Sequence, residues 1–184
     1  MRKVIVSTYV TLDGVMEELD KWHFRFINDE ALKYAKDQLF GSDALLMGRE
    51  TYEGFAASWP SMTDEEGFAD RMNGLPKHVA STTLEEPLEW NNSTLIEGDV
   101  AEEVSKLKQQ PGQDILMYGY GDLTRTLMQH GLIDELRMWV HPVVWGSGER
   151  PFKDDGDRTF LRLLDTTTFD SGVVILSYQP VQGE

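Results

Sequence analysis

Apolar positions along this chain follow two spacings in turn, one typical of strands and one typical of helices. Continuous apolar or β-branched runs at 3–10, 44–47 and 114–118 predict buried strands. Between the second and third runs, apolar residues fall on one face of a helix, at Tyr52, Phe55, Ala56 and Trp59. Strands that alternate with helices in this way are typical of a sheet with helices on both faces.

Capping and turn residues add boundaries to this pattern. Asn28 and Asp99 are predicted helix N-caps, since acidic residues follow each of them within the first turn. Short strands are expected at 77–81 and 94–96. The segment 14–26 is aromatic but has no clear period, so we expect an irregular loop of the kind that often binds ligands.

The pattern changes near position 134. Apolar residues at 136, 138 and 140 alternate with Arg137, Trp139 and His141, as expected for an antiparallel strand with two unlike faces. The stretches 160–169 and 173–178 are joined through Asp170-Ser171-Gly172, which favours a hairpin. The sequence therefore predicts an α/β fold with a mixed sheet and an antiparallel C-terminal hairpin.

Length and cysteine content restrict the class of protein. With 184 residues, 40% of them apolar, and no linker-like stretch, the chain is expected to form one domain over 1–180 with a short tail at 181–184. It has no cysteine, which excludes a disulfide framework and fits a reducing, cytoplasmic location. No apolar run reaches the roughly 18 residues of a membrane-spanning helix, and residues 1–10 lack a signal-peptide pattern.

The chain carries a formal net charge of −15. Nucleic acids and anionic membrane surfaces bind through basic patches, so neither is an expected partner. An anionic cofactor is compatible with this charge if its site gathers positive groups, for which Arg49, Arg71 and Lys77 are candidates. The histidines are scattered without metal-ligand spacing, so we expect no metal site.

Two strand-to-helix junctions carry the main chemical signal. The apolar run 44–47 leads into Gly48-Arg49-Glu50-Thr51, and the run 115–118 leads into Gly119-Tyr120-Gly121-Asp122. A helix that begins at the end of a strand presents unpaired backbone N–H groups and the positive end of its dipole, which together attract phosphate. Two such junctions are able to hold one dinucleotide.

These junctions, the turn Thr11-Leu12-Asp13-Gly14 and the segment 131–148 together resemble the dihydrofolate reductase-like superfamily. The closest resemblance is to the reductase domain of bifunctional riboflavin-biosynthesis deaminase-reductases, and it covers nearly the whole chain in order. It implies a three-layer fold whose central mixed sheet has about eight strands. It also implies NADPH across the carboxyl ends of the strands and hydride transfer to the C=N or C=O bond of a pterin-like, aminopyrimidine-like or other small substrate.

The resemblance further implies which residues contact the cofactor. Gly48, Arg49 and Thr51 would lie under its phosphates, with Arg49 near the ribose 2′-phosphate and Ser81 and Thr82 completing that pocket. Glycine at such turns lets the backbone approach an anion and adopt positive φ, which we expect of Gly48 and Gly121. The residues expected to border the nicotinamide or the pyrophosphate are Val10, Leu12, Gly14, Val15, Tyr118, Gly119, Tyr120, Gly121, Asp122 and Leu123. The charge of Asp122 would repel phosphate, which favours a helix N-cap role for it.

A reductase of this kind also needs a proton donor, usually a carboxyl group whose pKa is raised in an apolar pocket. By resemblance to the riboflavin branch, Asp13 faces the substrate and is the catalytic candidate, although a turn-forming role is an equal alternative. Asp29 and Glu30 open the first helix, where they also suit its dipole. Trp22 and Phe26 are candidates to stack on a flat substrate, or to lie in the core.

The resemblance implies a homodimer, for which the strand around Trp139 and the apolar segment 143–145 are candidate surfaces, unless both pack in the core. The leading hypothesis is therefore an NADPH-dependent reductase. A non-catalytic NADP(H)-binding or regulatory module on the same fold is the alternative, because a fold does not fix a function. An enzyme that uses flavin is a third possibility.

Overall fold

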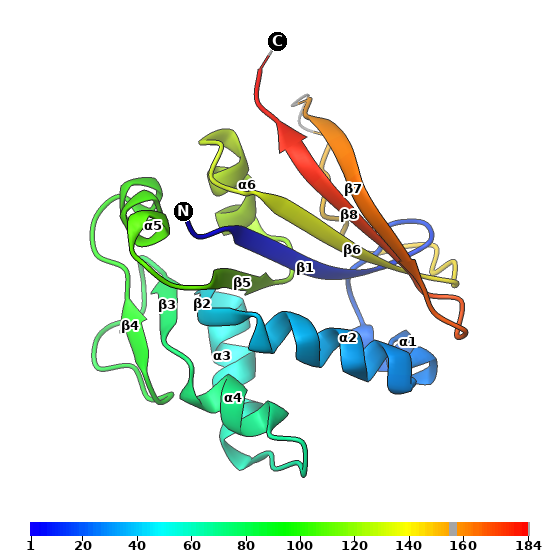
Figure 1. Ribbon diagram of the computed structural model, residues 1–184, viewed down its shortest axis with the longest axis horizontal. Helices are drawn as coiled ribbons and strands as arrows, with labels where there is room; N and C mark the ends of the chain where they lie inside the picture. Colours follow the sequence, from blue (N-terminus) through cyan, green and yellow to red (C-terminus); the bar gives the residue numbers. More distant parts are fainter. Residues whose placement is uncertain (155–157, 184) are drawn as a thin grey trace.

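The computed structural model describes residues 1–154 and 158–183, and its strands form one eight-stranded sheet in the order β4-β3-β2-β5-β1-β6-β8-β7 (Figure 1). The strands are β1 (Val4–Thr11), β2 (Ser42–Gly48), β3 (Lys77–Ala80), β4 (Ser93–Leu95), β5 (Asp114–Tyr118), β6 (Glu135–His141), β7 (Phe160–Thr168) and β8 (Val174–Val181). From β4 to β6 every neighbouring pair is parallel, whereas β6, β8 and β7 are antiparallel. The predicted mixed sheet and C-terminal hairpin are confirmed.

Helices cover both faces of the sheet, as the pattern of the sequence predicted. They are α1 (Leu19–Trp22), α2 (Asp29–Phe40), α3 (Arg49–Ser58), α4 (Phe68–Gly74), α5 (Val100–Gln109) and α6 (Asp122–Gln129), with short 3₁₀ turns η1 (Phe24–Phe26) and η2 (Trp59–Ser61). Figure 1 shows α2, α3 and α4 below the sheet and α5 and α6 above it. Among the described residues, no helix has the length and apolar character needed to cross a bilayer.

The two faces of the sheet carry separate cores because successive side chains of a strand point to opposite sides. In β2, Leu45 and Met47 pack with Tyr52 of α3, whereas Ala44 and Leu46 pack with Val104 of α5. Both faces of this strand are therefore buried, which explains its continuous apolar run. The face of α3 predicted at 52, 55, 56 and 59 lies in the first of these cores.

The predicted helix N-caps are also confirmed. Asn28 accepts a hydrogen bond from the backbone N–H of Ala31 at 2.9 Å, and Asp99 accepts one from the N–H of Glu102 at 2.9 Å. The irregular loop expected over 14–26 was wrong in part, because α1 and η1 fold within it. Their four and three residues are too short to show a helical period in the sequence.

The second face of β6 is covered rather than exposed. Trp139 is only 1% exposed, packs against Ala31 of α2 and donates from its indole Nε1 to the Ser7 hydroxyl at 3.0 Å. The expectation that Trp139 supplies a dimer surface was therefore wrong, because α2 buries this face. Nearby, Val144 in the segment 143–145 is 69% exposed.

The edge strand β7 presents the opposite situation. Eight of its nine residues are exposed, and among them are four large apolar side chains, Phe160, Leu161, Leu163 and Leu164. Its hydrogen-bonding neighbour in the sheet is β8, and no further strand lies beyond it among the described residues. Natural proteins usually protect an edge strand from pairing with another chain, so an edge strand with exposed apolar side chains is unusual.

Candidate functional site

The order in which the chain adds strands to the sheet reverses between β2 and β5. These strands are hydrogen-bonded neighbours, with Leu45 in register with Leu116. The chain leaves β2 through α3 on one face and returns in β3, whereas it leaves β5 through α6 on the other face and returns in β6 on the opposite side (Figure 1). In open α/β sheets, ligands bind outside the carboxyl ends of the strands at such a switch point. The two glycine junctions of the sequence meet there.

The helices that begin at these junctions start at glycine. Gly48 is the N-cap residue of α3 and Gly121 is that of α6, and neither helix receives a capping hydrogen bond from a side chain within 1–154 or 158–183. Asn28 and Asp99 provide such caps at α2 and α5. The first-turn N–H groups of α3 and α6 are thus left for other acceptors, next to the positive ends of two helix dipoles.

The glycines at these turns face open space. A Cβ atom built on Gly48, Gly119 or Gly121 meets no atom of residues 1–154 or 158–183 within 4 Å. Gly119 has a positive φ of 78°, but Gly48 and Gly121 have φ of −84° and −133°, so our expectation of positive φ for those two residues was wrong. Their absent side chains leave room above the turns rather than permit an unusual backbone conformation.

The first residue of α6 is Asp122, and the predicted N-cap role of this residue was also wrong because Gly121 occupies that position. The Asp122 side chain is 94% exposed and pairs with Arg125. The neighbouring Leu123 packs partly into the core beneath α6, and Tyr120 lies in the same core. The ring of Tyr120 contacts that of Phe152 at 5.2 Å. At this turn, exposed backbone rather than the Tyr120 or Leu123 side chains offers a binding surface.

Arg49 and the end of β3 come together as predicted. The Arg49 guanidinium donates from Nη1 to the Thr83 hydroxyl at 2.8 Å and from Nε to the Glu53 carboxylate at 2.9 Å. The Ser81 hydroxyl accepts hydrogen bonds from the N–H groups of Thr83 and Leu84, both at 3.1 Å. The sequence predicted Ser81 and Thr82 at this corner but not Thr83.

The remaining two hydroxyl residues of this corner also lie near Gly48 and Ser81 in the chain. Thr51, half-buried, is in the first turn of α3, and Thr82 is exposed beside Ser81. Together with Arg49, the corner combines a guanidinium with several hydroxyl groups, a donor set suited to a phosphate. The ion pair with Glu53 partly neutralises the guanidinium.

Asp13 connects two loops and does not lie in an apolar pocket. Its carboxylate accepts hydrogen bonds from the Thr11 hydroxyl at 2.6 Å and from the N–H groups of Trp145 and Gly146 at 3.0 and 2.8 Å. These bonds, led by that from Thr11, hold the pKa of Asp13 well below its usual range. The expected acid with a raised pKa is therefore wrong for Asp13, and the turn-forming alternative describes it.

The other two carboxylate candidates are exposed at the start of α2. Asp29 and Glu30 lie in its first turn, and the Glu30 carboxylate accepts a hydrogen bond from the N–H of Asp170 at 2.9 Å. Neither group has the apolar surroundings that a neutral acid requires.

The end of β1 and the loop after it contain two buried residues among the predicted cofactor contacts. Val10 and Val15 are 4% and 0% exposed, so a contact of either residue with a nicotinamide would be made through its backbone. A Cβ atom on Gly148 would approach Val15 to 2.6 Å, which shows how closely the 142–153 segment covers that residue. Leu12 is 67% exposed, and Gly14 has a positive φ of 82° at the turn.

The aromatic substrate candidates are mostly internal. Trp22 is 1% exposed and donates from Nε1 to the Glu17 carbonyl at 2.8 Å, so of the two alternatives for this residue the structure favours the core role over stacking on a substrate. Phe26 is half-buried against the core that contains Trp139. Its ring lies 5.8 Å from that of His141, a residue that the sequence did not connect with this segment.

Tyr118 is the last residue of β5, directly before the second glycine turn. Its hydroxyl is buried without a hydrogen-bond partner among the described residues, and its ring lies 5.6 Å from that of Phe55 in α3. Burial raises the pKa of Tyr118, so the hydroxyl remains a donor. An unpaired buried hydroxyl is costly, and a bound ligand group at this edge would relieve that cost.

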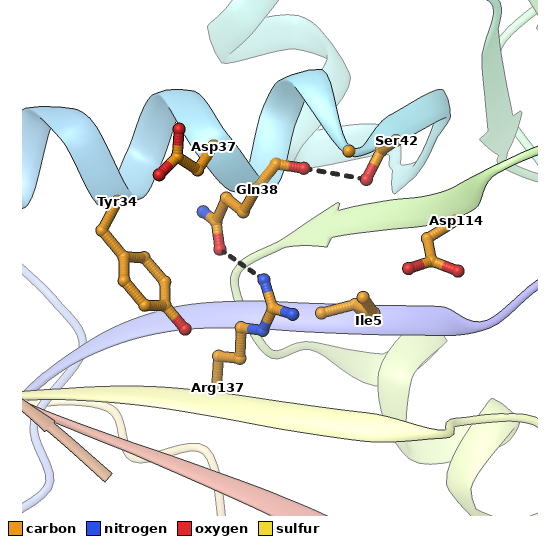
Figure 2. A pocket seen from close by; sticks show the side chains of 8 residues that line it. Ile5, Tyr34, Asp37, Gln38, Ser42, Asp114 and Arg137 are labelled. Atoms are coloured by element: carbon orange, nitrogen blue, oxygen red, sulfur yellow. Dashed lines mark hydrogen bonds between the residues drawn. The ribbon is translucent and has the colours of Figure 1, made fainter. Parts of the chain in front are cut away.

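Two hollows lie away from this edge. One of about 280 Å³ lies between α2 and the amino ends of the strands, where the Arg137 guanidinium donates a hydrogen bond to the Gln38 side chain (Figure 2). Another of about 510 Å³ lies between β4 and α5. Neither of these two hollows is lined by a residue of the two glycine turns.

The order of the strands and the position of the helices define the dihydrofolate reductase-like fold. Within that superfamily, the chain belongs to the RibD C-terminal domain family, whose pattern matches residues 2–175.

Individual relatives extend over the same length. The uncharacterized protein YyaP of Bacillus subtilis is 35% identical over 180 residues, which are 96% of this chain and 94% of that protein. A putative riboflavin biosynthesis protein from Shewanella sp. PV-4 has a similar structure, with a TM-score of 0.75, 18% identity and coverage of 98% and 99% of the two chains. A pyrimidine reductase-like protein from Corynebacterium diphtheriae has a TM-score of 0.70, 14% identity and coverage of 99% and 93%. The two structures share the fold of this chain.

Proposed function

We propose that this protein is an NADPH-dependent reductase that transfers hydride to a C=N or C=O bond of a small heterocycle, most simply a pyrimidine. The observation that carries the proposal is the pair of adjacent, uncapped helix N-termini at the switch point, each preceded by glycine that leaves open space. Such N-termini suit the diphosphate of a dinucleotide. Membership of the RibD C-terminal domain family, and the similarity to a pyrimidine reductase-like protein from Corynebacterium diphtheriae, favour a reductase of a pyrimidine.

Each part of the edge has a role in this proposal. The amides at the start of α3 and α6 bind the diphosphate, and Arg49, with the hydroxyls of Ser81 and Thr83, binds the ribose 2′-phosphate. When bound, the reduced nicotinamide supplies the hydride. Tyr118 supplies a hydroxyl donor beside the second glycine turn.

A test of the activity uses NADPH that carries deuterium at the transferable position. We expect the protein to consume it in the presence of an aminopyrimidine, a dihydropterin or a small carbonyl compound, and to place deuterium in the reduced product, which mass spectrometry detects. If NADPH binds but no member of this panel receives deuterium, the reductase proposal fails.

The second candidate function is a non-catalytic NADP(H)-binding module. It is favoured by the hydrogen-bonded Asp13 carboxylate and by the exposed positions of Asp29 and Glu30, which leave the proton donor unassigned. The same deuterium experiment distinguishes the two functions, because the module binds NADPH and transfers nothing.

We also propose that two copies of the chain associate through β7. This strand carries one arginine and one aspartate and therefore no net charge, in a chain whose formal charge is −15. Two copies can approach along this strand with less repulsion than along an acidic surface. An antiparallel pair of identical strands is compatible with twofold symmetry and buries the exposed leucines.

A further inference from the structure

Two histidines that are far apart in the chain form a direct ring-to-ring hydrogen bond. Nδ1 of His23, which lies between α1 and η1, is 2.9 Å from Nε2 of His141 at the end of β6. His141 is 1% exposed, whereas His23 is half-buried. No local pattern in the sequence predicts this pair, because 118 positions separate its members.

The surroundings of His141 determine which nitrogen atoms carry hydrogen. Its Nδ1 is 2.9 Å from the Trp139 carbonyl oxygen and 3.2 Å from the Val10 carbonyl oxygen, and both oxygens can only accept. Nδ1 of His141 therefore donates, and in a neutral ring its Nε2 accepts from the Nδ1–H of His23. A neutral His23 is then left with a bare Nε2, an acceptor without a hydrogen-bond partner among the described residues.

Both rings are neutral at physiological pH. Burial, with a smaller contribution from His141, lowers the pKa of His23 to about 4, and burial also lowers the pKa of His141. The rings around the pair belong to Tyr9, Trp22, Phe24 and Phe26. Within the described part of the chain, neither histidine takes part in a salt bridge, so no carboxylate offsets the cost of a charged ring.

The pair lies at the same edge of the sheet as the glycine turns. His141 is in register with Thr11 at the carboxyl end of β1, and His23 stacks on Tyr9 of that strand with ring centroids 4.2 Å apart. Tyr118 at the carboxyl end of the neighbouring β5 is in register with Ser7, two residues before Tyr9 in β1. Burial raises the pKa of Tyr9 to about 12.

This row of side chains combines hydrogen-bond donors with one acceptor. Tyr118 and Tyr9 offer hydroxyl groups that stay protonated, and His23 offers a lone pair on Nε2. Phe24, which is 65% exposed, lies 5.5 Å from the His23 ring and adds an apolar surface. A flat heterocycle with neighbouring C=O and N–H groups is complementary to such a row.

We propose that His23 is a specificity-determining residue whose Nε2 accepts a hydrogen bond from a ring N–H or amino group of the substrate. His141 is the positioning residue that holds His23 in the required tautomer. The inference rests on the proposed reductase function and deepens it, since it assigns the substrate class as a heterocycle with an N–H donor. It excludes N-alkylated analogues that lack such a donor.

The tautomers can be tested without any ligand. Histidine ring ¹⁵N shifts at neutral pH are expected to show His23 with hydrogen on Nδ1 and a bare Nε2, and His141 with hydrogen on Nδ1. If His23 carries hydrogen on Nε2, or is doubly protonated at pH 7, the inference is overturned whatever the protein reduces.

Recognition is tested with uracil and 1,3-dimethyluracil, which differ in their ring N–H groups. We expect uracil to bind the NADPH-saturated protein and to shift the His23 Nε2 resonance, whereas dimethyluracil binds more weakly. The substitution His23→Phe keeps a ring to stack on Tyr9 but removes the acceptor, so it should weaken uracil binding about tenfold, as expected for one lost hydrogen bond, and leave dimethyluracil binding unchanged.

Two further variants control this experiment. His23→Gln supplies an amide oxygen as acceptor and should recover most of the uracil affinity, and His130→Gln, at the exposed end of α6, should match the wild type. Uracil binding that is absent from the NADPH-loaded wild type, or unchanged in a folded His23→Phe protein, overturns the inference. Failure of NADPH itself to bind overturns the proposed function instead, so the two failures are distinguishable.

Discussion

The substitution Gly48→Ala tests whether the cofactor needs the space above the first glycine turn, because it fills that space with little effect on the stability of the fold. The added Cβ meets no atom of the described part of the chain within 4 Å. With φ of −84° and ψ of 178°, the backbone conformation at this position is open to any L-residue. The substitution therefore changes the volume available to a ligand without straining the protein.

The expected effect on folding is small. Alanine reduces the freedom of the unfolded chain, which stabilises the protein by about 0.4–1 kcal/mol. It is also a poorer N-cap than glycine, which costs a similar amount, up to about 1 kcal/mol. The two contributions largely cancel, so we expect the free energy of unfolding to stay within about 1 kcal/mol of the wild-type value.

The expected effect on NADPH binding is large. A methyl group beside the first-turn amides of α3 moves a phosphate oxygen away from at least one N–H donor. A hydrogen bond to a charged group contributes about 1.5–3 kcal/mol, so the dissociation constant should rise about 10- to 100-fold. Isothermal titration calorimetry measures this constant, and urea denaturation measures stability.

Gly54→Ala is the matched control. Gly54 lies inside α3, and its added Cβ also meets no atom within 4 Å. We expect a gain of about 0.5–1 kcal/mol in stability from better helix propensity and no change in NADPH affinity. If a folded Gly48→Ala protein binds NADPH as tightly as the wild type, or if Gly54→Ala weakens binding equally, the assignment of the open space above Gly48 to the cofactor is wrong.

Four further predictions concern cofactor choice, stability, loop contacts and assembly. Arg49→Ala should weaken NADPH binding about tenfold and leave NADH binding unchanged in competition titrations, because only NADPH carries the 2′-phosphate; equal losses for both cofactors would remove Arg49 from that role. Lys77→Met should lower the free energy of unfolding by about 2–4 kcal/mol in urea titrations, because the Lys77 ammonium donates to three backbone carbonyls. Burial lowers the pKa of Lys77 from 10.5 to about 8 in the folded protein. Between pH 8 and 10.5 the unfolded chain therefore binds more protons than the folded protein, and the stability of the wild type should rise with pH. The same rise in the Lys77→Met variant would refute this assignment. The Asp13 carboxylate accepts hydrogen bonds from two backbone amides, so Asp13→Asn should speed the hydrogen exchange of these amides. In the wild type, the lowered pKa of Asp13 should keep them protected until strong acid. Unchanged exchange in Asp13→Asn would contradict the loop contact. Leu163→Glu on β7 should convert a dimer to a monomer in sedimentation equilibrium, and a wild-type monomer at micromolar concentration would end the dimer proposal.

The sequence predicted the order of strands and helices because most elements bury a regular apolar face. The runs in β2 and β5 and the helix face at 52–59 are local patterns that the fold keeps. The two glycine junctions were also visible, since each follows a buried strand directly. The two junctions lie close together because β2 and β5 are neighbouring strands, with Leu45 in register with Leu116.

The remaining parts depended on contacts between distant segments. The pKa of Asp13 is lowered first by the Thr11 hydroxyl, two positions away, and then by the amides at 145 and 146, more than 130 positions away. A local turn signal could reveal only the first of these contacts. The alternation in β6 suggested an exposed face, but α2 and the α1–η1 segment cover Trp139 and His141. The same coverage brings His23 to His141, a contact for which the sequence holds no local pattern.

The most direct measurement is a crystal structure of the protein grown with NADPH. We expect density for the diphosphate between the amides after Gly48 and those after Gly121, and density for the 2′-phosphate beside the Arg49 guanidinium. Cofactor density at another part of the molecule, or empty glycine turns in crystals whose protein is saturated in solution, would contradict the assignment of this edge as the dinucleotide site.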